Sequence, residues 1–431
     1  MKSVCVINVV GLTPELLKYA PHIRALGTSV PWSPPVPAVT CTSQATLLTG
    51  RPPSSHGIVA NGWYFKDTSE IRFWQQSRNL IDCEALLYDG IETAKLFWWF
   101  NQHSGVRWSA TPKPHYGCDG SKVFDIIDRT ECNLTQEIGP FPFFTFWGPN
   151  AGFPCSDWIS KAASIVVRKH KPPLTLVYLP HLDYDYQRFT THDPKRVSEV
   201  DQCAKRIIDV CGDVGTTPIV VSEYGLVPVN RPIYINRVLR NANLLDVRLG
   251  PFGEMLMPGD SQAFAVADHQ VAHVYVRDKE NIPVVRNLLE STEGIEQVAA
   301  PDDIGLAHRR SGDLVALAKS DSWFCYYYWN DDRFAPDFAR TVDIHRKPGY
   351  DPVELFMTSK VRAMARLLQM KLGFRYKMDV IPLDANLVKG SHGVLTTPEK
   401  GPLVVGPNPP HEMVDFANYV RGLLGKPPLP A

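Results

Sequence analysis

Four short apolar runs constrain the fold of this chain most strongly, because each ends in polar residues or a turn. They cover residues 4–10, 94–100, 174–179 and 218–221. Segments with helical periodicity lie between them, for example at residues 158–168 and 197–210. Continuous apolar strands that alternate with helices are typical of a parallel sheet buried on both faces. The sequence therefore predicts an α/β fold in which helices sandwich a mostly parallel central sheet.

The chain changes character between about residue 246 and about residue 340. Strands are predicted at residues 263–267, 271–276 and 313–318, with a helix at 283–289 and a turn at Asp268-His269 between the first two strands. A length of 431 residues is long for one compact core. We therefore expect a core formed by residues 1–245 and 341–431, with an inserted α+β cap subdomain at residues 246–340.

Charge and cysteine content limit the partners and the compartment. The chain has 45 basic and 45 acidic residues, so its net charge gives no reason to expect a nucleic acid polymer or an anionic membrane. Its nine cysteines lack C-x-x-C spacing, which favours a reducing, cytoplasmic location over a disulfide framework or a thiolate zinc site. No apolar run reaches the 18 residues of a transmembrane helix. We expect a soluble cytoplasmic protein.

Polar and glycine residues collect where the predicted strands end, at residues 8–11, 181–185 and 222–225. In an open α/β sheet, ligands bind outside the carboxyl ends of the strands. Carboxylates or imidazoles occur at or near such positions, or in glycine turns, as Asp183, Asp185, Glu223 and His392. Each could instead be structural, since an aspartate at a strand end is often a turn or capping residue.

The most informative motif is P-A-V-T-C-T-S-Q-A-T-L-L-T-G-R-P, at residues 37–52. A proline-rich loop leads into a short predicted helix whose first residues carry hydroxyl groups, and Gly50 is expected to end it. A hydroxyl at a helix N-terminus lies in the field of unpaired N–H groups, where it can meet an anion and act as a nucleophile. The alternative is that Thr40 or Thr42 only caps the helix.

The order of these segments resembles the type I phosphodiesterase and nucleotide pyrophosphatase branch of the alkaline phosphatase superfamily, over nearly the whole chain. The strongest part is residues 40–64, where T-x5-T-L-L-T-G-x2-P-x2-H-G-I and N-G-x-Y are similar to the family's nucleophile segment. The resemblance implies an alkaline phosphatase-like fold. It also implies hydrolysis of a phosphodiester, pyrophosphate or phosphomonoester by attack of Thr40 on phosphorus, with a divalent metal and a transient phosphothreonine.

Several of the family's metal-binding positions are replaced in this chain. The aspartate at the end of the first strand falls on Val10, with Asn8 as a weak neutral substitute, and a histidine of the middle motif falls on Gln187. The family's Asp-His doublet falls on Glu223-Tyr224. The resemblance leaves Asp183, Glu223 and His392 to hold zinc, manganese or magnesium, with one ion rather than two as an open alternative.

Replacement ligands can be sought elsewhere in the chain. His345 lies in an irregular segment beside Arg346 and Lys347, two cations suited to phosphate. His269 and His273 share one face of a predicted strand segment, although structural roles are favoured for both.

Two functions remain open at this point. The first is a hydrolase of a small phosphorylated substrate, with Thr40 as nucleophile. The predicted substrate contacts are Ser43, Asn8, Asn61, Gln187, Arg346 and Lys347. The alternative is a catalytically degenerate relative that binds a phosphorylated nucleotide or a lipid-linked metabolite, with Arg188, Arg346 and Lys347 supplying the positive charge without metal.

Overall fold

An eight-stranded sheet forms the centre of the computed structural model, which describes residues 2–118, 122–189, 192–374, 376–394 and 397–430. The strands lie in the order β2-β20-β9-β1-β8-β5-β6-β7. The inner strands from β9 to β6 are parallel, whereas β2, β20 and β7 pair antiparallel at the two edges. The predicted α/β fold with a mostly parallel sheet is confirmed. The sheet strands are β1 (Val4–Val9), β2 (Thr28–Pro31), β5 (Thr93–Leu96), β6 (Trp108–Tyr116), β7 (Lys122–Asp128), β8 (Leu174–Leu179), β9 (Thr217–Val221) and β20 (Leu403–Gly406).

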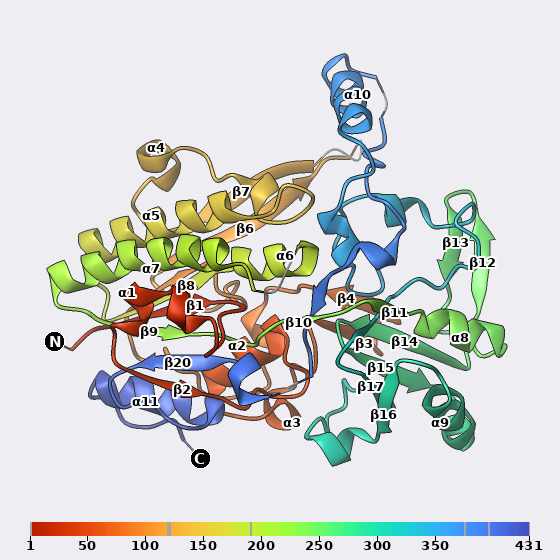
Figure 1. Cartoon of the computed structure of the whole chain (residues 1–431), viewed down its shortest axis with the longest axis horizontal. Helices are drawn as coiled ribbons and strands as arrows, with labels where there is room; N and C mark the ends of the chain where they lie inside the picture. Colours follow the sequence, from red (N-terminus) through yellow and green to blue (C-terminus); the bar gives the residue numbers. More distant parts are fainter. Residues whose placement is uncertain (1, 119–121, 190–191, 375, 395–396, 431) are drawn as a thin grey trace.

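Helices cover both faces of this sheet (Figure 1). Cys5, Ile7 and Val9 of β1 belong to the core under α5 and α7, whereas Val6 belongs to the core under α2 and α11. Since successive strand residues point to opposite faces, Asn8 faces the same side as Val6, toward α2. The helices that cover the sheet are α2 (Thr40–Thr49), α5 (Phe153–His170), α7 (Pro194–Val214) and α11 (Phe416–Leu423).

Two predicted segments differ from the structure in detail. The run at residues 94–100 is a strand only as far as Leu96, because Phe97 and Phe100 have φ angles of 63° and 57° and leave the extended conformation. The polar segment after β8 folds at once into helix α6 (His181–Arg188). Asp183 therefore lies in the first turn of a helix, directly beyond the carboxyl end of a central strand.

A second sheet lies beside the first and has the order β14-β15-β17-β16, all antiparallel. Its strands are β14 (Ala263–Asp268), β15 (Val271–Val276), β16 (Ile295–Ala299) and β17 (Leu314–Ala318), and α9 (Ile282–Glu290) packs on it. Its hydrophobic core also takes in residues from the later chain, such as Tyr350 and Val388. The subdomain boundary near residue 340 therefore stays a prediction.

The remaining elements are short, except for α10 (Lys360–Lys371), which protrudes from the body in Figure 1. Among the described residues, every helix is too short or too polar to cross a bilayer. The short elements are α1 (Pro21–Arg24), α3 (Pro53–His56), β3 (Gly62–Phe65), β4 (Glu70–Phe73), α4 (Leu134–Ile138), β10 (Val227–Pro228), β11 (Arg231–Ile233), α8 (Ile235–Asn241), β12 (Val247–Gly250), β13 (Gly253–Leu256), β18 (Ser322–Phe324) and β19 (Gly390–Ser391).

Candidate active site

Thr40 is the first residue of α2 rather than its cap. The N-cap position belongs to Val39, which makes no side-chain capping bond, and Gly50 ends the helix with a φ of 64°. The capping alternative for Thr40 and Thr42 is therefore wrong. Thr40 is only 3% exposed. Its hydroxyl lies 3.0 Å from the hydroxyl of Tyr224, and either oxygen can be the donor.

Tyr224 connects Thr40 with a buried pair formed by Asp183 and His392. The Tyr224 ring stacks on the His392 ring with centroids 3.6 Å apart. His392 Nε2 lies 3.6 Å from Asp183 Oδ1. The turn that carries Tyr224 is tightly packed, because a Cβ at Gly225 would lie 1.9 Å from the carbonyl oxygen of Lys400. Any other residue at position 225 would displace this turn.

Glu223 lies on the other side of Thr40, at the carboxyl end of β9. Its Oε1 accepts hydrogen bonds from Asn8 Nδ2 and, at 2.6 Å, from Gln44 Nε2. Its main-chain carbonyl accepts a hydrogen bond from the Ser43 hydroxyl at 3.3 Å. Asn8 and Gln44, from two distant segments, thus hold the carboxyl group beside the start of α2, and Ser43 holds the main chain of the same residue.

A third acidic group, Asp268, reaches the site from the tip of the β14–β15 hairpin. Asn61 donates to it through its main-chain N–H at 2.7 Å and its side-chain amide at 3.1 Å, and also accepts from Cys41 N at 2.9 Å. Asp268 Oδ1 lies 2.7 Å from His269 Nδ1. His269 adopts a φ of 59°, a strained conformation for such a side chain, and its ring packs against both His392 and Tyr350.

Gln187 and Tyr350 complete the wall around Asp183. Gln187 Nε2 donates to Asp183 Oδ2 at 2.9 Å, and Tyr350 donates to Gln187 Oε1 at 2.7 Å. One carboxylate oxygen of Asp183 therefore points toward Gln187 and the other toward His392. The predicted residues Thr40, Ser43, Asn8, Asn61, Gln187, Asp183, Glu223 and His392 are all within this buried network.

Burial governs the charge of the site. It raises the pKa of Asp183 to about 7, against the lowering effect of Gln187 and Tyr224, and raises that of Glu223 to about 8. Asp268 likewise has its pKa raised by burial, to about 6. Burial and the neighbouring His269 hold the pKa of His392 well below its usual value. At neutral pH, His392 is neutral and Glu223 is mostly protonated.

The hydrogen bonds of His392 show how the site suits a cation. Its Nδ1 lies 2.7 Å from the carbonyl oxygen of Ala38, so the N–H is on Nδ1 and the lone pair is on Nε2. His392 Nε2 and Asp183 Oδ1 thus face each other, and neither has a hydrogen-bond partner among the residues that the structure describes. One divalent ion with bonds of about 2 Å to each atom can span their 3.6 Å separation. A carbonyl that accepts from the other ring nitrogen is the usual partner of a metal-binding histidine.

Fewer donors remain for a second ion. Val10 offers none, Glu223 Oε1 accepts from Asn8 and Gln44, and the Tyr224 hydroxyl contacts Thr40, which leaves Glu223 Oε2 on this side of the site. Within the ranges that the structure describes, no three His, Cys, Asp or Glu side chains are grouped so as to hold a metal ion. Asp183 and His392 are thus the pair of side chains best placed to hold an ion.

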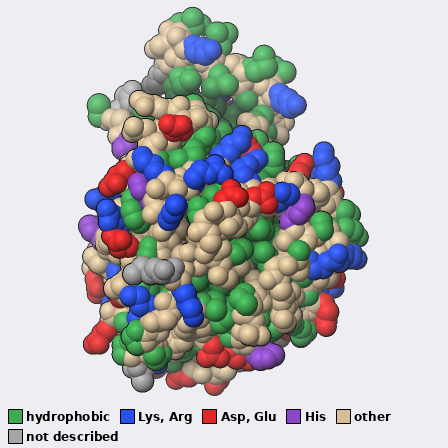
Figure 2. Space-filling view, turned by 90° about the vertical axis from the view of Figure 1, so that its left-hand side faces the viewer, with side chains coloured by type: hydrophobic (Ala, Val, Ile, Leu, Met, Phe, Trp, Pro, Cys, Tyr) green, Lys and Arg blue, Asp and Glu red, His purple; other side chains and the backbone are tan. Residues whose placement is uncertain are grey.

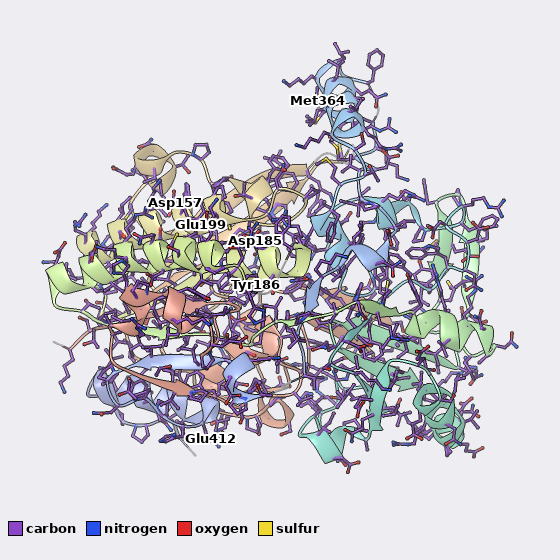
Figure 3. The ribbon with its side chains drawn as sticks, in the orientation of Figure 1. Asp157, Asp185, Tyr186, Glu199, Met364 and Glu412 are labelled. Atoms are coloured by element: carbon purple, nitrogen blue, oxygen red, sulfur yellow. The ribbon has the colours of Figure 1, made fainter. Side chains whose placement is uncertain are left out.

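Several other candidates from the sequence lie outside this network. Asp185 turns toward α7 and pairs with Arg188 and Arg196 (Figure 3). Lys347 is 1% exposed and sits between Asp351 and Glu354, with both distances at 2.7 Å. His273 contacts Val59 O and Gly312 N, which is a structural role. None of these groups faces Thr40.

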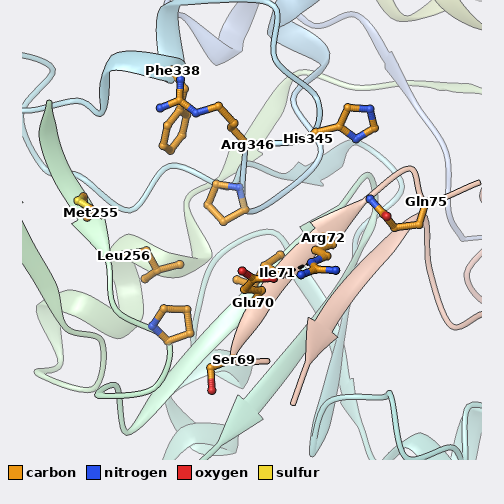
Figure 4. A pocket seen from close by; sticks show the side chains of 12 residues that line it. Ser69, Glu70, Ile71, Arg72, Gln75, Met255, Leu256, Phe338, His345 and Arg346 are labelled. Carbon is orange, nitrogen blue, oxygen red and sulfur yellow. Dashed lines mark hydrogen bonds and ion pairs between the residues drawn. The ribbon is translucent and has the colours of Figure 1, made fainter. Parts of the chain in front are cut away.

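His345 and Arg346 line a separate cavity of about 550 Å³ between β4, β13 and the segment that carries them (Figure 4). His345 Nδ1 approaches Phe73 O at 3.3 Å, and Arg346 pairs with Asp337 at 3.2 Å. The structure does not bring these two residues to Thr40, since both line this cavity and contact Phe73 and Asp337 instead.

Sequence reasoning missed Gln44, Asp268 and Tyr350 as members of the site. Asp268-His269 is an Asp-His doublet, the pattern that the resemblance assigned to residues 223–224, but its place in a strand-like insertion indicated only a turn. Tyr350 lies within the irregular segment at residues 343–351 that carries several site-type residues. The hairpin tip and this segment meet at Thr40 only through tertiary packing.

Comparisons with known proteins agree with this fold. The chain resembles the structure of phosphonoacetate hydrolase from Sinorhizobium meliloti 1021 in complex with phosphonoformate, with a TM-score of 0.63 and 15% identity over 98% of this chain and 96% of that one. It also resembles an inactive threonine-to-alanine variant of murine ectonucleotide pyrophosphatase/phosphodiesterase 5 in complex with AMP, with a TM-score of 0.59 and 15% identity over 100% and 96% of the two chains. A search of curated proteins found no match.

The profile of the type I phosphodiesterase/nucleotide pyrophosphatase family matches residues 4–351, which include the whole Thr40 segment, Asp183, Glu223 and the β14–β15 hairpin. This match agrees with the resemblance seen in the order of the motifs, and it indicates a hydrolase of the phosphodiesterase or pyrophosphatase type. The chain belongs to the type I phosphodiesterase/nucleotide pyrophosphatase family.

Proposed function

We propose that this protein hydrolyses a small phosphodiester, pyrophosphate or phosphomonoester, with Thr40 as the nucleophile. The observation that carries the proposal is the contact between Thr40 and Tyr224, 3.0 Å apart, at the N-terminus of a helix. The positive end of the helix dipole favours an anion beside the hydroxyl. The related murine protein, whose threonine-to-alanine variant is inactive and binds AMP, supports a threonine at this centre.

Tyr224 and Asp183 provide a path for the Thr40 proton. Tyr224 lies close enough to Asp183 that each shifts the pKa of the other. As Thr40 Oγ1 attacks phosphorus, its proton passes to the Tyr224 oxygen while the Tyr224 proton passes to Asp183. The bond from phosphorus to the leaving oxygen breaks, and that oxygen takes up the proton that Asp183 received.

Water then hydrolyses the phosphothreonine and regenerates Thr40, with the same groups exchanging the proton in reverse. A divalent cation bound by Asp183 and His392 would offset the negative charge of the phosphate oxygens. Glu223, protonated near neutral pH, adds no negative charge that would repel the phosphate. Asn8 and Gln44 keep this carboxyl oriented.

The test compares Thr40→Ala with Thr49→Ala, a matched control at the other end of the same helix. The Thr49 hydroxyl donates a hydrogen bond to Ala45 O at 2.7 Å and accepts one from Arg51 N at 3.1 Å. Hydrolysis of bis-(p-nitrophenyl) phosphate and of p-nitrophenyl phosphate is measured with added Zn²⁺, Mn²⁺ or Mg²⁺ and with a chelator. We expect Thr40→Ala to lose at least about a hundredfold in rate, and Thr49→Ala to retain activity.

Two results would overturn the proposal. Undiminished turnover in Thr40→Ala would exclude this nucleophile. Tight binding of AMP by the unmodified protein, without turnover of either substrate under any metal condition, would instead identify a binding protein.

A further inference from the structure

Helix α10 turns its most apolar face away from the protein. Its half-buried residues recur every third position and face the body; they are Ala363, Arg366 and Gln369. The spacing of four large apolar residues places them on the opposite face. They are Val361, Met364, Leu368 and Leu372, with exposures of 76%, 68%, 58% and 62%. A surface helix of a globular protein ordinarily directs its apolar stripe inward, so α10 is reversed.

A narrow neck joins the helix to the body of the protein. The chain leaves the body at Thr358 and returns at Val380, where Thr358 N–H donates to Val380 O at 2.8 Å. Arg362 and Arg366 both pair with Asp379 at this base, at 2.5 and 2.9 Å. Figure 1 shows the helix projecting beyond the sheets, and Figure 2 shows hydrophobic side chains gathered on the same projection. The outer face is therefore convex and accessible, without a neighbouring wall that would make a groove.

Cations dominate the charge of this arm, whose one acidic residue, Asp379, pairs with Arg362 and Arg366 at the base. Residues 360–378 contain six lysines and arginines and no aspartate or glutamate, although the whole chain has no net charge. By helical spacing, Lys360 and Lys371 border the apolar face, and neither is ion-paired among the described residues. A short helix with large apolar side chains on one face and cations beside them is typical of binding to an anionic membrane surface.

The size of the patch favours a bilayer over a second copy of the chain. The exposed parts of Val361, Met364, Leu368, Leu372 and Phe374 amount to roughly 500–600 Å². A standard protein interface buries about 800 Å² on each partner. Two identical arms would also bring like charges together, whereas anionic headgroups complement Lys360 and Lys371.

We propose that α10 docks this protein on an anionic lipid bilayer. The apolar outer face inserts at the boundary between headgroups and acyl chains, while Lys360 and Lys371 lie at the lipid phosphates. Docking of this kind would place the chain at a membrane surface without crossing it.

The test uses the full chain with vesicles of phosphatidylcholine alone or mixed with phosphatidylglycerol, and measures the bound fraction by sedimentation. Met364→Glu/Leu368→Glu places two carboxylates on the outer face; Figure 3 labels Met364 there. We expect at least about a tenfold loss of affinity for mixed vesicles. The matched control is Val284→Glu on α9, a residue 60% exposed on another helix, and it should bind as the unmodified chain does.

Replacing Lys360 and Lys371 by alanine should weaken binding to mixed vesicles about fivefold for each lysine, and added salt should reduce this difference. Circular dichroism and thermal unfolding check that each variant is folded. The proposal is overturned if the unmodified chain stays in the supernatant with both vesicle types, or if Met364→Glu/Leu368→Glu binds equally well. A dimer in light scattering that this double variant abolishes, without vesicle binding, would assign the face to self-association instead.

Discussion

Replacement of Glu223 by glutamine should change how the stability of this protein depends on pH. Glu223 is fully buried, and its Oε1 accepts from Asn8 and Gln44 while Oε2 has no partner. Glutamine has the same shape and can keep the Oε1 contacts. It resembles the protonated carboxyl, and it cannot acquire a negative charge.

The pKa of Glu223 determines the direction of the effect. Burial raises it from 4.5 to about 8, with Gln44 and Asn8 acting against this rise. The folded protein therefore holds the Glu223 proton more tightly than the unfolded chain does. The stability contributed by this group is fully present below pH 4.5, falls as pH rises to about 8, and is level above that.

The magnitude follows from the same shift. Each pKa unit corresponds to about 1.4 kcal/mol, so ionisation of Glu223 costs on the order of 5 kcal/mol of folding free energy above pH 8. The glutamine variant avoids this cost but buries an unpaired amide N–H, at about 1–3 kcal/mol. We expect Glu223→Gln to be about 2–4 kcal/mol more stable than the unmodified chain at pH 9. At pH 4.5, where the cost of ionisation is absent, the variant should be about 1–3 kcal/mol less stable than the unmodified chain.

Urea unfolding at pH 4.5, 7 and 9 in the presence of a chelator measures this difference. Glu412→Gln is the control, because Glu412 is exposed and water surrounds it in both states. Its stability relative to the unmodified chain should not change with pH. A difference between Glu223→Gln and the unmodified chain that stays constant from pH 4.5 to 9 would refute the argument from burial.

Three further substitutions test other parts of the site. Tyr224→Phe keeps the ring that stacks on His392 but removes the hydroxyl 3.0 Å from Thr40, so kcat should fall by about a hundredfold while circular dichroism is unchanged. His392→Ala should weaken binding of Zn²⁺ or Mn²⁺ at least about tenfold in isothermal titration calorimetry, and equal affinity would exclude it as a ligand. Lys347→Met leaves two buried carboxylates without their cation and should lower the free energy of unfolding by about 3–5 kcal/mol in urea, whereas a loss below 1 kcal/mol would contradict the buried pairing.

The elements that carry the site could be predicted because their signals are local. The strand at residues 174–179 and the hydroxyl-rich helix ended by Gly50 are each encoded within about ten residues, through apolar continuity and a glycine that adopts a positive φ. The carboxyl ends of parallel strands share one edge, so Asp183 and Glu223 could be expected beside Thr40. His392 was a candidate because of its glycine turn, and the resemblance to a family assigned it to the metal site.

The remaining members of the site could not be predicted, since their positions depend on contacts between distant segments. Asp268 reaches Asn61 across 207 residues, and Tyr350 reaches Gln187 across 163. Lys347 looks like a phosphate-binding cation in sequence, but two carboxylates that approach it in the folded chain neutralise it. A net charge of zero likewise conceals the cationic arm at residues 360–378.

The sequence by itself thus determined the α/β fold, the family and the location of Thr40 at the start of a helix, because apolar periodicity and turn residues act over short range. Only the tertiary structure decided which groups surround Thr40, that Asp183 and His392 face each other as unpaired acceptors, and that α10 directs its apolar face outward. These features depend on how buried side chains from distant segments pack and on how burial alters their charge.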